Sequence, residues 1–251
     1  MRVGTLQNIG KREEQQDSFC LSNTQSEQAL NAKGIMAVVA DGMGGLEGGA
    51  AISKIVTDTF SKNYFRQNIS SGADFLYESG KAAETMVEKY IERTGIEGGS
   101  TLVAVIIRNR EVNYISVGDS RIYLLRNGIL RKINREHNYG EVLKVKAARG
   151  EVDDNEPYVN PQRHSLTAYI GMGGFHTVDR NQQPRLLEVG DKILLCSDGV
   201  YNALGNDALI ELLKFNAPVA ARKIEEKILE QNLPKQDNFT GIILELCRKE
   251  V

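Results

Sequence analysis

The sequence predicts an α+β fold in which two antiparallel β-sheets pack face to face and helix pairs cover both outer surfaces, a four-layer α-β-β-α sandwich. Short apolar runs occur in adjacent pairs separated by turn residues, which is typical of hairpins and not of βαβ units. Two segments with helical spacing precede most of these runs and two more lie near the C-terminus, so each sheet has a helix pair to cover it. The 251 residues, 41% of them hydrophobic, are enough for one large domain or two small ones.

The elements of the first hundred residues follow from apolar spacing. Residues 34–40 (GIMAVVA) predict a short buried strand, which runs directly into the stretch Asp41-Gly42-Met43-Gly44-Gly45. Apolar residues at helical spacing predict one helix over residues 52–64 and a second over residues 73–91. Gly98-Gly99 ends the second helical pattern.

The middle of the chain is dense in predicted strands. They cover residues 101–107, 112–117, 122–125 and 129–133. Asn127-Gly128 is a strong hairpin signal, because both residues tolerate positive φ in a type I′ turn. Gly190-Asp191 predicts another hairpin between residues 186–189 and 193–196.

The rest of the chain predicts a less regular segment and a helical C-terminal part. Between residues 136 and 163 the apolar pattern weakens, and we expect one short helix and an irregular flap. Helices are predicted over residues 207–215 and 217–231, followed by a final strand over residues 239–247.

Composition excludes several classes of protein. The formal net charge of −2 does not resemble the basic footprint of a nucleic-acid binder. The N-terminal segment has no apolar region typical of a signal peptide, and no apolar run is long enough to span a membrane. Cys20, Cys196 and Cys247 are odd in number and widely spaced, which favours free thiols and a reducing compartment. We therefore expect a cytoplasmic protein that binds neither nucleic acid nor membrane.

Several aspartates stand at the ends of predicted strands beside glycine. They are Asp41, Asp119 and Asp198, with Asp17 and Asp237 near the two ends of the chain. A single Asp-Gly pair indicates only a turn. Several carboxylates that converge at the rim of a sandwich must be solvated, paired or bound to a cation. An all-oxygen ligand set, without a Cys/His cluster, favours Mg²⁺ or Mn²⁺ over Zn²⁺.

Six short motifs occur in a fixed order. They are Arg12 to Asp17 (REEQQD), Asp41 to Gly45 (DGMGG), Gly99-Ser100-Thr101, Gly118-Asp119-Ser120-Arg121, Ser197-Asp198-Gly199 and Asp237-Asn238-Phe239-Thr240. With these motifs the sequence resembles, over nearly its whole length, the bacterial protein phosphatase 2C-like (PPM) family of metal-dependent serine/threonine protein phosphatases. The resemblance implies one catalytic domain over residues 1–251, with a flap at about residues 136–165.

The resemblance also implies a role for each motif residue. Asp41, Asp198 and Asp237 are the expected catalytic metal ligands, and the main-chain carbonyl of Gly42 helps Asp41 to bridge two ions. Asp17 is expected to hold metal-bound waters with Gln16 nearby, and Asp119 is similar to the family's third metal ligand. Arg12 is expected to bind the substrate phosphate, because a guanidinium can contact two phosphate oxygens at once.

The implied reaction is hydrolysis of phosphoserine and phosphothreonine in proteins. Two Mn²⁺ or Mg²⁺ ions, with a third in some states, share a water and lower its pKa, and the resulting metal-bound hydroxide attacks phosphorus in line. The implied partners are phosphoproteins that a cognate serine/threonine kinase has modified, and we expect a monomer. Histidines 137, 164 and 176 are isolated and are expected to be structural or solvated, and Arg121 is expected to brace its own loop.

The match departs from the family pattern without loss of a metal carboxylate. The departures are Gln15, Leu46, Ala50, Glu136, Ala168, Tyr169 and Gly241. They leave the flap contacts and the choice of substrate open. Two other functions also remain: a non-catalytic adaptor of the same fold that binds phosphoproteins, and a metal phosphatase that acts on a small phosphorylated metabolite. An adaptor is typically recognised by a missing metal aspartate, and all five aspartates are present here.

Overall fold

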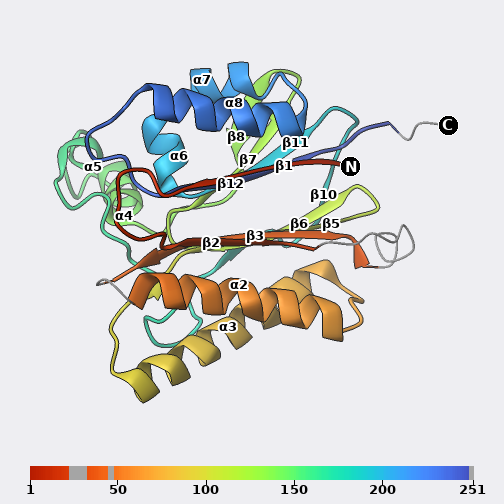
Figure 1. The fold of residues 1–251 in the computed structure, drawn as a ribbon. Helices are drawn as coiled ribbons and strands as arrows, with labels where there is room; N and C mark the ends of the chain where they lie inside the picture. The colour runs from red at the N-terminus through yellow and green to blue at the C-terminus, as the bar shows by residue number, and fades with distance from the viewer. Residues whose placement is uncertain (23–32, 45–47, 249–251) are drawn as a thin grey trace.

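Two antiparallel sheets pack face to face in the computed structural model, which describes residues 1–22, 33–44 and 48–248. Gly45 of the DGMGG stretch and Leu46 lie outside these ranges. Helices α2 and α3 form the lower layer in Figure 1, and α6, α7 and α8 form the upper layer. The predicted four-layer α-β-β-α sandwich is confirmed.

One sheet has five strands, all paired antiparallel. In spatial order they are β1 (Arg2–Asn8), β12 (Phe239–Glu245), β11 (Lys192–Cys196), β7 (Arg121–Arg126) and β8 (Ile129–Lys132). Asn127 and Gly128, between β7 and β8, have φ of 51° and 77°, so the predicted turn with positive φ at both residues is confirmed.

The other sheet has seven strands. Its main path is β10 (Arg185–Leu186), β6 (Glu111–Val117), β5 (Leu102–Arg108), β3 (Ile35–Met43) and β2 (Asp17–Leu21). Two short strands extend it: β4 (Gly99–Ser100) pairs with β3, and β9 (Asp179–Arg180) pairs with β6.

Helices cover the outer face of each sheet. The seven-stranded sheet is covered by α2 (Gly48–Arg66) and α3 (Gly72–Thr94), and the five-stranded sheet by α6 (Asp198–Ala203), α7 (Asn206–Leu212) and α8 (Ala217–Glu230). Ser71 caps α3 by accepting a hydrogen bond from the Asp74 N–H, and Gly95 ends the helix in a left-handed conformation. Among the described residues, no helix combines the length and hydrophobicity needed to cross a membrane.

The core has three apolar layers, because both faces of the central strands are buried. Val38 faces the layer beneath α2 and α3, whereas the next residue, Val39, faces the layer between the sheets. Ile242 and Ile243 divide in the same way between the middle layer and the layer beneath α8. Strands buried on both faces read as continuous apolar runs, which is why the sequence shows them clearly.

The predicted hairpin around Gly190-Asp191 is wrong. Residues 185–186 pair with β6 in the seven-stranded sheet, whereas β11 pairs with β7 and β12 in the five-stranded sheet. The turn therefore crosses from one sheet to the other. The buried Asp191 carboxylate holds it by accepting hydrogen bonds from the Arg126 guanidinium and from the Glu188 N–H.

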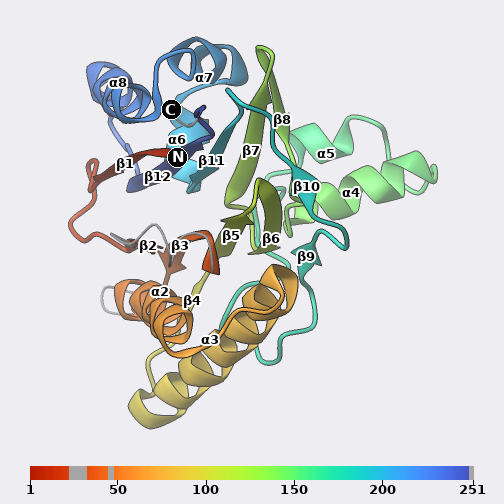
Figure 2. The same ribbon diagram turned by 90° about the vertical axis from the view of Figure 1, so that its right-hand side faces the viewer.

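Three other differences concern segments with weak patterns. The flap contains two short helices, α4 (Tyr139–Ala148) and α5 (Glu156–Val159), where one was expected, and Figure 2 shows them at one side of the sandwich. Strands β1 and β2 were not predicted, because each has a mixed polar and apolar composition. Helix α6 was also missed, since it is short and begins directly at the Asp198-Gly199 turn.

Candidate active site

Acidic side chains from both sheets reach one end of the sandwich. Asp17 begins β2 and lies opposite Asp41 of β3 in the antiparallel register. Asp119 lies in the connection between β6 and β7, Asp198 begins α6 directly after β11, and Asp237 lies just before β12. Residues more than two hundred positions apart in the sequence therefore meet at one rim.

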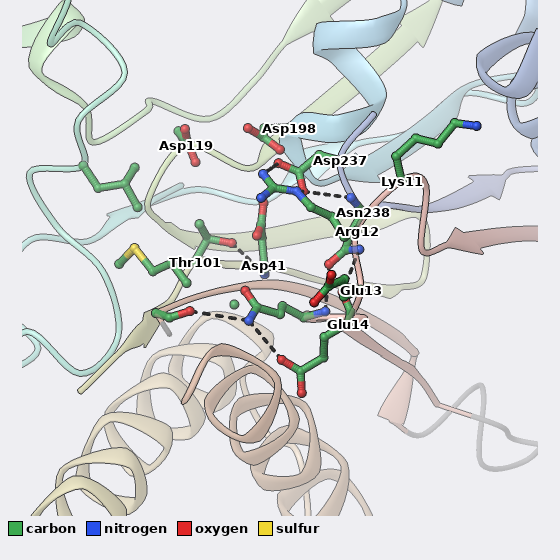
Figure 3. Close-up of a pocket in the computed structure, with 15 residues that line it drawn as sticks. Lys11, Arg12, Glu13, Glu14, Asp41, Thr101, Asp119, Asp198, Asp237 and Asn238 are labelled. Carbon is green, nitrogen blue, oxygen red and sulfur yellow. Dashed lines mark hydrogen bonds and ion pairs between the residues drawn. The ribbon is translucent and has the colours of Figure 1, made fainter. Parts of the chain in front are cut away.

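Four of these aspartates line a single cavity of about 630 Å³. They are Asp41, Asp119, Asp198 and Asp237, and Arg12, Gln16 and Gly42 line the same cavity (Figure 3). Asp17 is buried and is not among the lining residues. The structure thus brings the sequence-predicted residues together, with Asp17 behind the wall of the cavity.

Asp41 is fixed by a threonine on the neighbouring strand. The Asp41 N–H donates to Thr101 Oγ1 at 3.0 Å, and the Thr101 N–H donates to the Asp41 carbonyl at 2.8 Å. Thr101 Oγ1 also lies 2.7 Å from Ser120 Oγ, in the turn that carries Asp119. Thr101 was recognisable in the sequence only as part of a motif; in the structure its contacts tie Asp41 to the Asp119 turn.

Asp17 is held by a serine from the other sheet. Ser197 Oγ donates to Asp17 Oδ2 at 2.7 Å and accepts the Thr240 N–H at 3.0 Å. Ser197 directly precedes Asp198 and is fully buried. This contact joins the two sheets beneath the cavity, a role for Ser197 that its motif in the sequence did not indicate.

Glycine is required beside Asp41. A Cβ at Gly42 would lie 2.2 Å from the Gly49 carbonyl oxygen and 2.6 Å from that of Gln16. The Gly42 N–H donates to the Gln16 carbonyl at 3.1 Å, so the end of β3, helix α2 and the segment before β2 are in close main-chain contact. Only a residue without a side chain allows this approach.

Burial and mutual repulsion raise the pKa values of these carboxyl groups. Burial, followed by the charges of Asp17 and Asp198, raises the pKa of Asp41 well above its ordinary value. Burial and the neighbouring Asp237 raise the pKa of Asp198 to about 6. For Asp119 the causes are burial and Asp198, and its pKa is raised to about 7. The cavity therefore favours a bound cation.

A guanidinium group already lies among these carboxylates. Arg12 Nε and Nη2 donate to Asp237 Oδ1 and Oδ2, each at 2.7 Å, although the Arg12 side chain is 59% exposed. Asp198 and Asp41 also contribute to raising the Arg12 pKa. Arg12 was predicted to bind substrate phosphate; here its fork holds a carboxylate predicted to bind metal.

The donor set fits divalent metal ions. The cavity contains carboxylate and main-chain oxygens, which Mg²⁺ and Mn²⁺ prefer. The carboxylates have raised pKa values, and a cationic side chain lies among them. Within the described ranges, however, no three acidic, histidine or cysteine side chains come close enough to form a ready-made metal shell.

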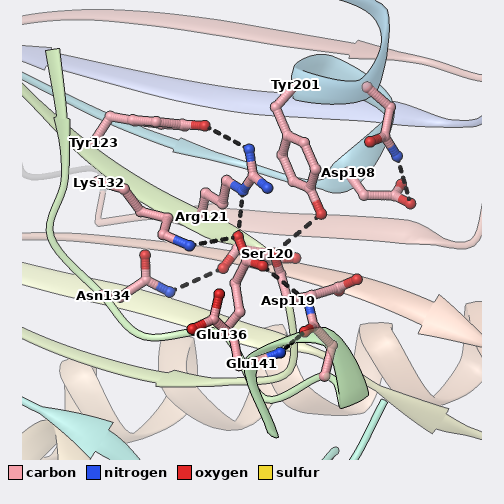
Figure 4. A network of polar contacts seen from close by, with 12 residues as sticks. Asp119, Ser120, Arg121, Tyr123, Lys132, Asn134, Glu136, Glu141, Asp198 and Tyr201 are labelled. Carbon is pink, nitrogen blue, oxygen red and sulfur yellow. Dashed lines mark hydrogen bonds and ion pairs between the residues drawn. The ribbon is translucent and has the colours of Figure 1, made fainter. Parts of the chain in front are cut away.

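A polar network braces the Asp119 turn (Figure 4). The Arg121 guanidinium donates to Glu136 and to the Tyr123 hydroxyl, and it stacks 3.5 Å from the centre of the Tyr201 ring. The Tyr201 hydroxyl donates to the Asp119 carbonyl at 3.2 Å. Arg121 therefore braces its own loop, as predicted.

The same turn contacts the beginning of the flap. The main-chain N–H of Gly118 donates to His137 Nδ1 at 3.1 Å, and the His137 N–H donates to the Gly118 carbonyl. His137 is buried and has a structural role. Asn138 caps α4 and donates to Glu136, so Glu136 links the flap to Arg121.

Comparison with known proteins identifies a family and similar folds. A family model described as protein phosphatase 2C matches residues 7–236. The serine/threonine phosphatase Stp of Listeria monocytogenes is 29% identical over 218 residues, covering 83% of each chain. The Streptococcus agalactiae serine/threonine phosphatase has a similar fold, with a TM-score of 0.82 and 23% identity over 98% of this chain and 99% of that one.

A further solved structure is similar in fold. The catalytic domain of the serine/threonine protein phosphatase PstP, crystallised with two manganese ions, has a similar fold. Its TM-score is 0.77 and its sequence identity 22%, over 98% of each chain.

Proposed function

The chain belongs to the protein phosphatase 2C family, and we propose that it hydrolyses phosphoserine and phosphothreonine in proteins with divalent metal ions. The observation that carries this proposal is the cavity in which Asp41, Asp198 and Asp237 converge with Arg12. A cluster of partly buried carboxylates is costly in a protein that does not bind a cation there.

The proposed metal ligands are Asp41, the Gly42 carbonyl, Asp198 and Asp237. Asp17 orients the surrounding waters, with Gln16 nearby, and Asp119 with Asp198 serves a third ion. When bound, two Mn²⁺ or Mg²⁺ ions supply Lewis-acid chemistry that lowers the pKa of a shared water. The residues around them fix this geometry: Thr101 holds Asp41, Ser197 holds Asp17, and Tyr201 holds the Asp119 main chain.

Arg12 is the proposed phosphate ligand. Its two-pronged contact with Asp237 supports this role, because the same pair of N–H groups matches two oxygens of a phosphate. The exposed position of Arg12 at the cavity rim leaves it accessible to a phosphorylated side chain on another protein. Arg12 would orient the phosphate and offset charge on its oxygens in the transition state.

A cysteine nucleophile is disfavoured. Burial raises the pKa values of Cys20 and Cys196 to about 12, so both thiols are protonated near neutral pH. Neither thiol lines the cavity. No cysteine is among the described residues that line the cavity, and the proposed reaction is direct hydrolysis by a water that bound metal ions would activate.

The decisive test is turnover of a phosphothreonine peptide and an aryl phosphate, with Mn²⁺ and with excess chelator. We expect both substrates to turn over only with metal, and Asp41→Asn and Asp198→Asn to be nearly inactive while still folded. Asp191→Asn is the matched control. Asp191 is a buried aspartate that directly precedes β11 and does not line the cavity. Peptide binding without turnover would indicate the adaptor, and turnover of small phosphates alone would indicate a metabolite phosphatase.

The proposed partners are phosphoproteins modified by a serine/threonine kinase. A monomeric state and a cytoplasmic location remain predictions from the sequence. Size-exclusion chromatography with light scattering and cell fractionation test them directly.

A further inference from the structure

The loop that carries Arg12 crosses from one sheet to the other. This segment, residues 9–16, is here called the Arg12 loop; it leaves β1 in the five-stranded sheet and enters β2 in the seven-stranded sheet. A loop between two sheets has no strand neighbour along its length, so its position must be set by other contacts.

The Arg12 loop lies against the segment just before β12. The Lys11 N–H donates to the Gln236 carbonyl at 2.8 Å. Gly10 has a φ of 63°, and a Cβ there would lie 2.3 Å from the Asp237 carbonyl oxygen. The loop is therefore seated directly on the main chain that carries Asp237.

One side chain fastens both ends of this loop. Asn238 Nδ2 donates to the Ile9 carbonyl at 2.8 Å and to the Glu14 carbonyl at 3.0 Å. Asn238 Oδ1 accepts the Gln16 N–H at 2.8 Å. These contacts lie on both sides of Arg12, and Asn238 is only 5% exposed (Figure 3).

We infer that Asn238 is a positioning residue that holds the Arg12 loop, so that phosphate binding by Arg12 depends on it. The inference rests on the proposed function, in which Arg12 binds the substrate phosphate. Asp237 contacts the guanidinium and its neighbour Asn238 contacts the main chain of the loop. Two consecutive residues before β12 thus hold the Arg12 side chain and the main chain of the Arg12 loop.

The chemistry of the contacts requires an amide. Two carbonyls face the donor end of the side chain and one N–H faces its acceptor end, which an asparagine matches and an aspartate does not. Asn238→Asp keeps the size but turns a carboxylate oxygen toward two carbonyls. Asn238→Ala removes all three hydrogen bonds without adding charge.

The first test needs no turnover. Residue-resolved hydrogen exchange in the metal-free protein reports on the Gln16 N–H, which donates a hydrogen bond to Asn238 Oδ1. We expect Gln16 to be protected in the wild type and to exchange roughly tenfold faster in Asn238→Ala, the cost of about one net hydrogen bond. Equal exchange rates in the two proteins, or an unprotected Gln16 in the wild type, would overturn the inference.

The second test separates positioning from general damage. With saturating Mn²⁺, Asn238→Asp is expected to raise KM for a phosphothreonine peptide, and Ki for inorganic phosphate, roughly tenfold, and to change kcat less. In an Arg12→Ala background the same substitution should add less than about twofold, because the loop then carries nothing to position. If Asn238→Asp does not fold, Asn238→Ala replaces it in this cycle.

Asn181→Asp is the matched control. Asn181 makes the same pattern of three bonds far from the cavity: its Oδ1 accepts the Tyr114 N–H, and its Nδ2 donates to the carbonyls of Val112 and Gln183. It should leave KM and Ki unchanged. An unchanged KM in Asn238→Asp, or an equal increase with and without Arg12, overturns the inference. Absence of turnover in the wild type would instead contradict the proposed function, and the exchange experiment would still decide the role of Asn238.

Discussion

At the scale of single residues, the protein treats its buried and half-buried aspartates in two ways. Asp191 is 2% exposed and receives the Arg126 guanidinium and the Glu188 N–H, so its charge is fully compensated within the protein. Asp41 instead faces other carboxylates, which raise its pKa together with burial. A buried charge needs a partner. The contrast indicates that the charge of Asp41 is compensated by a cation that binds in the cavity from solution.

The exposed Arg12 side chain is predicted to contribute to binding of the substrate phosphate. Arg12→Ala is expected to raise KM for a phosphothreonine peptide roughly tenfold or more, since hydrogen bonds to a charged group contribute about 1.5–3 kcal/mol. The effect on kcat should be smaller, because the aspartates that hold the ions remain. Steady-state kinetics at saturating Mn²⁺ measures both constants.

Arg2→Ala is the control for Arg12. Arg2 is also a half-exposed arginine near a carboxylate, with Nη1 3.9 Å from Glu245, but it lies on β1 outside the cavity. It should leave KM unchanged. A large loss of kcat in Arg12→Ala at constant KM would assign Arg12 to the transition state and not to phosphate binding.

At the scale of elements, the site depends on connections and not on the strands alone. The Asp119 turn is braced through Arg121, and Arg121 is held by Glu136 at the start of the flap. Glu136 is 6% exposed and accepts hydrogen bonds from Arg121, Lys132 and Asn138. These contacts lower its pKa, even though burial acts in the opposite direction. Its charge is therefore needed in the folded protein.

Removal of this carboxylate should destabilise the fold. Glu136→Ala leaves the partly buried Arg121 without its anionic partner, and we expect a loss of roughly 3 kcal/mol in the free energy of unfolding. Urea denaturation measures it. Glu188→Ala, which removes the 58%-exposed partner of Arg126, should cost less than about 1 kcal/mol. Equal losses for the two variants would contradict a structural role for the Glu136 network.

Elements were predictable from the sequence where their pattern was strong. Strand β3 and the β5–β6 pair are buried on both faces and read as apolar runs, and α2 and α3 have clear helical spacing. Strand β1 was not visible, because its composition is mixed polar and apolar and its partner β12 lies at the other end of the chain. The Gly190-Asp191 turn resembled a hairpin, and the contact of Asp191 with Arg126, which helps to hold the turn between the two sheets, is not local in the sequence.

The candidate site followed the same rule. Asp41, Asp119 and Asp198 could be predicted because strand ends beside glycine are recognisable in a sequence. The residues that hold them could not, since their contacts are not local. Ser197 meets Asp17 across 180 positions, and Asn238 meets Glu14 across 224.

At the scale of the whole molecule, metal binding and folding should be linked. The carboxylates of the cavity come from both sheets, so the unfolded chain does not present them together. A ligand that binds only the folded state stabilises it, by about 2.7 kcal/mol at a hundred times its Kd. Mn²⁺ should therefore raise the free energy of unfolding, and excess chelator should remove the gain.

Relative to the wild type, Asp41→Asn should raise the free energy of unfolding in chelator and lower it in Mn²⁺. In chelator the variant is expected to be more stable than the wild type, because the substitution removes a charge that burial and the neighbouring aspartates disfavour. In Mn²⁺ it should be less stable than the wild type, since a ligand is missing. Asp191→Asn should be less stable in both, because Arg126 and the Glu188 N–H lose the buried carboxylate that accepts their hydrogen bonds. Urea denaturation of the three proteins, each with Mn²⁺ and with chelator, gives the six values; destabilisation by Asp41→Asn in chelator would show that its carboxylate serves the fold and not a cation.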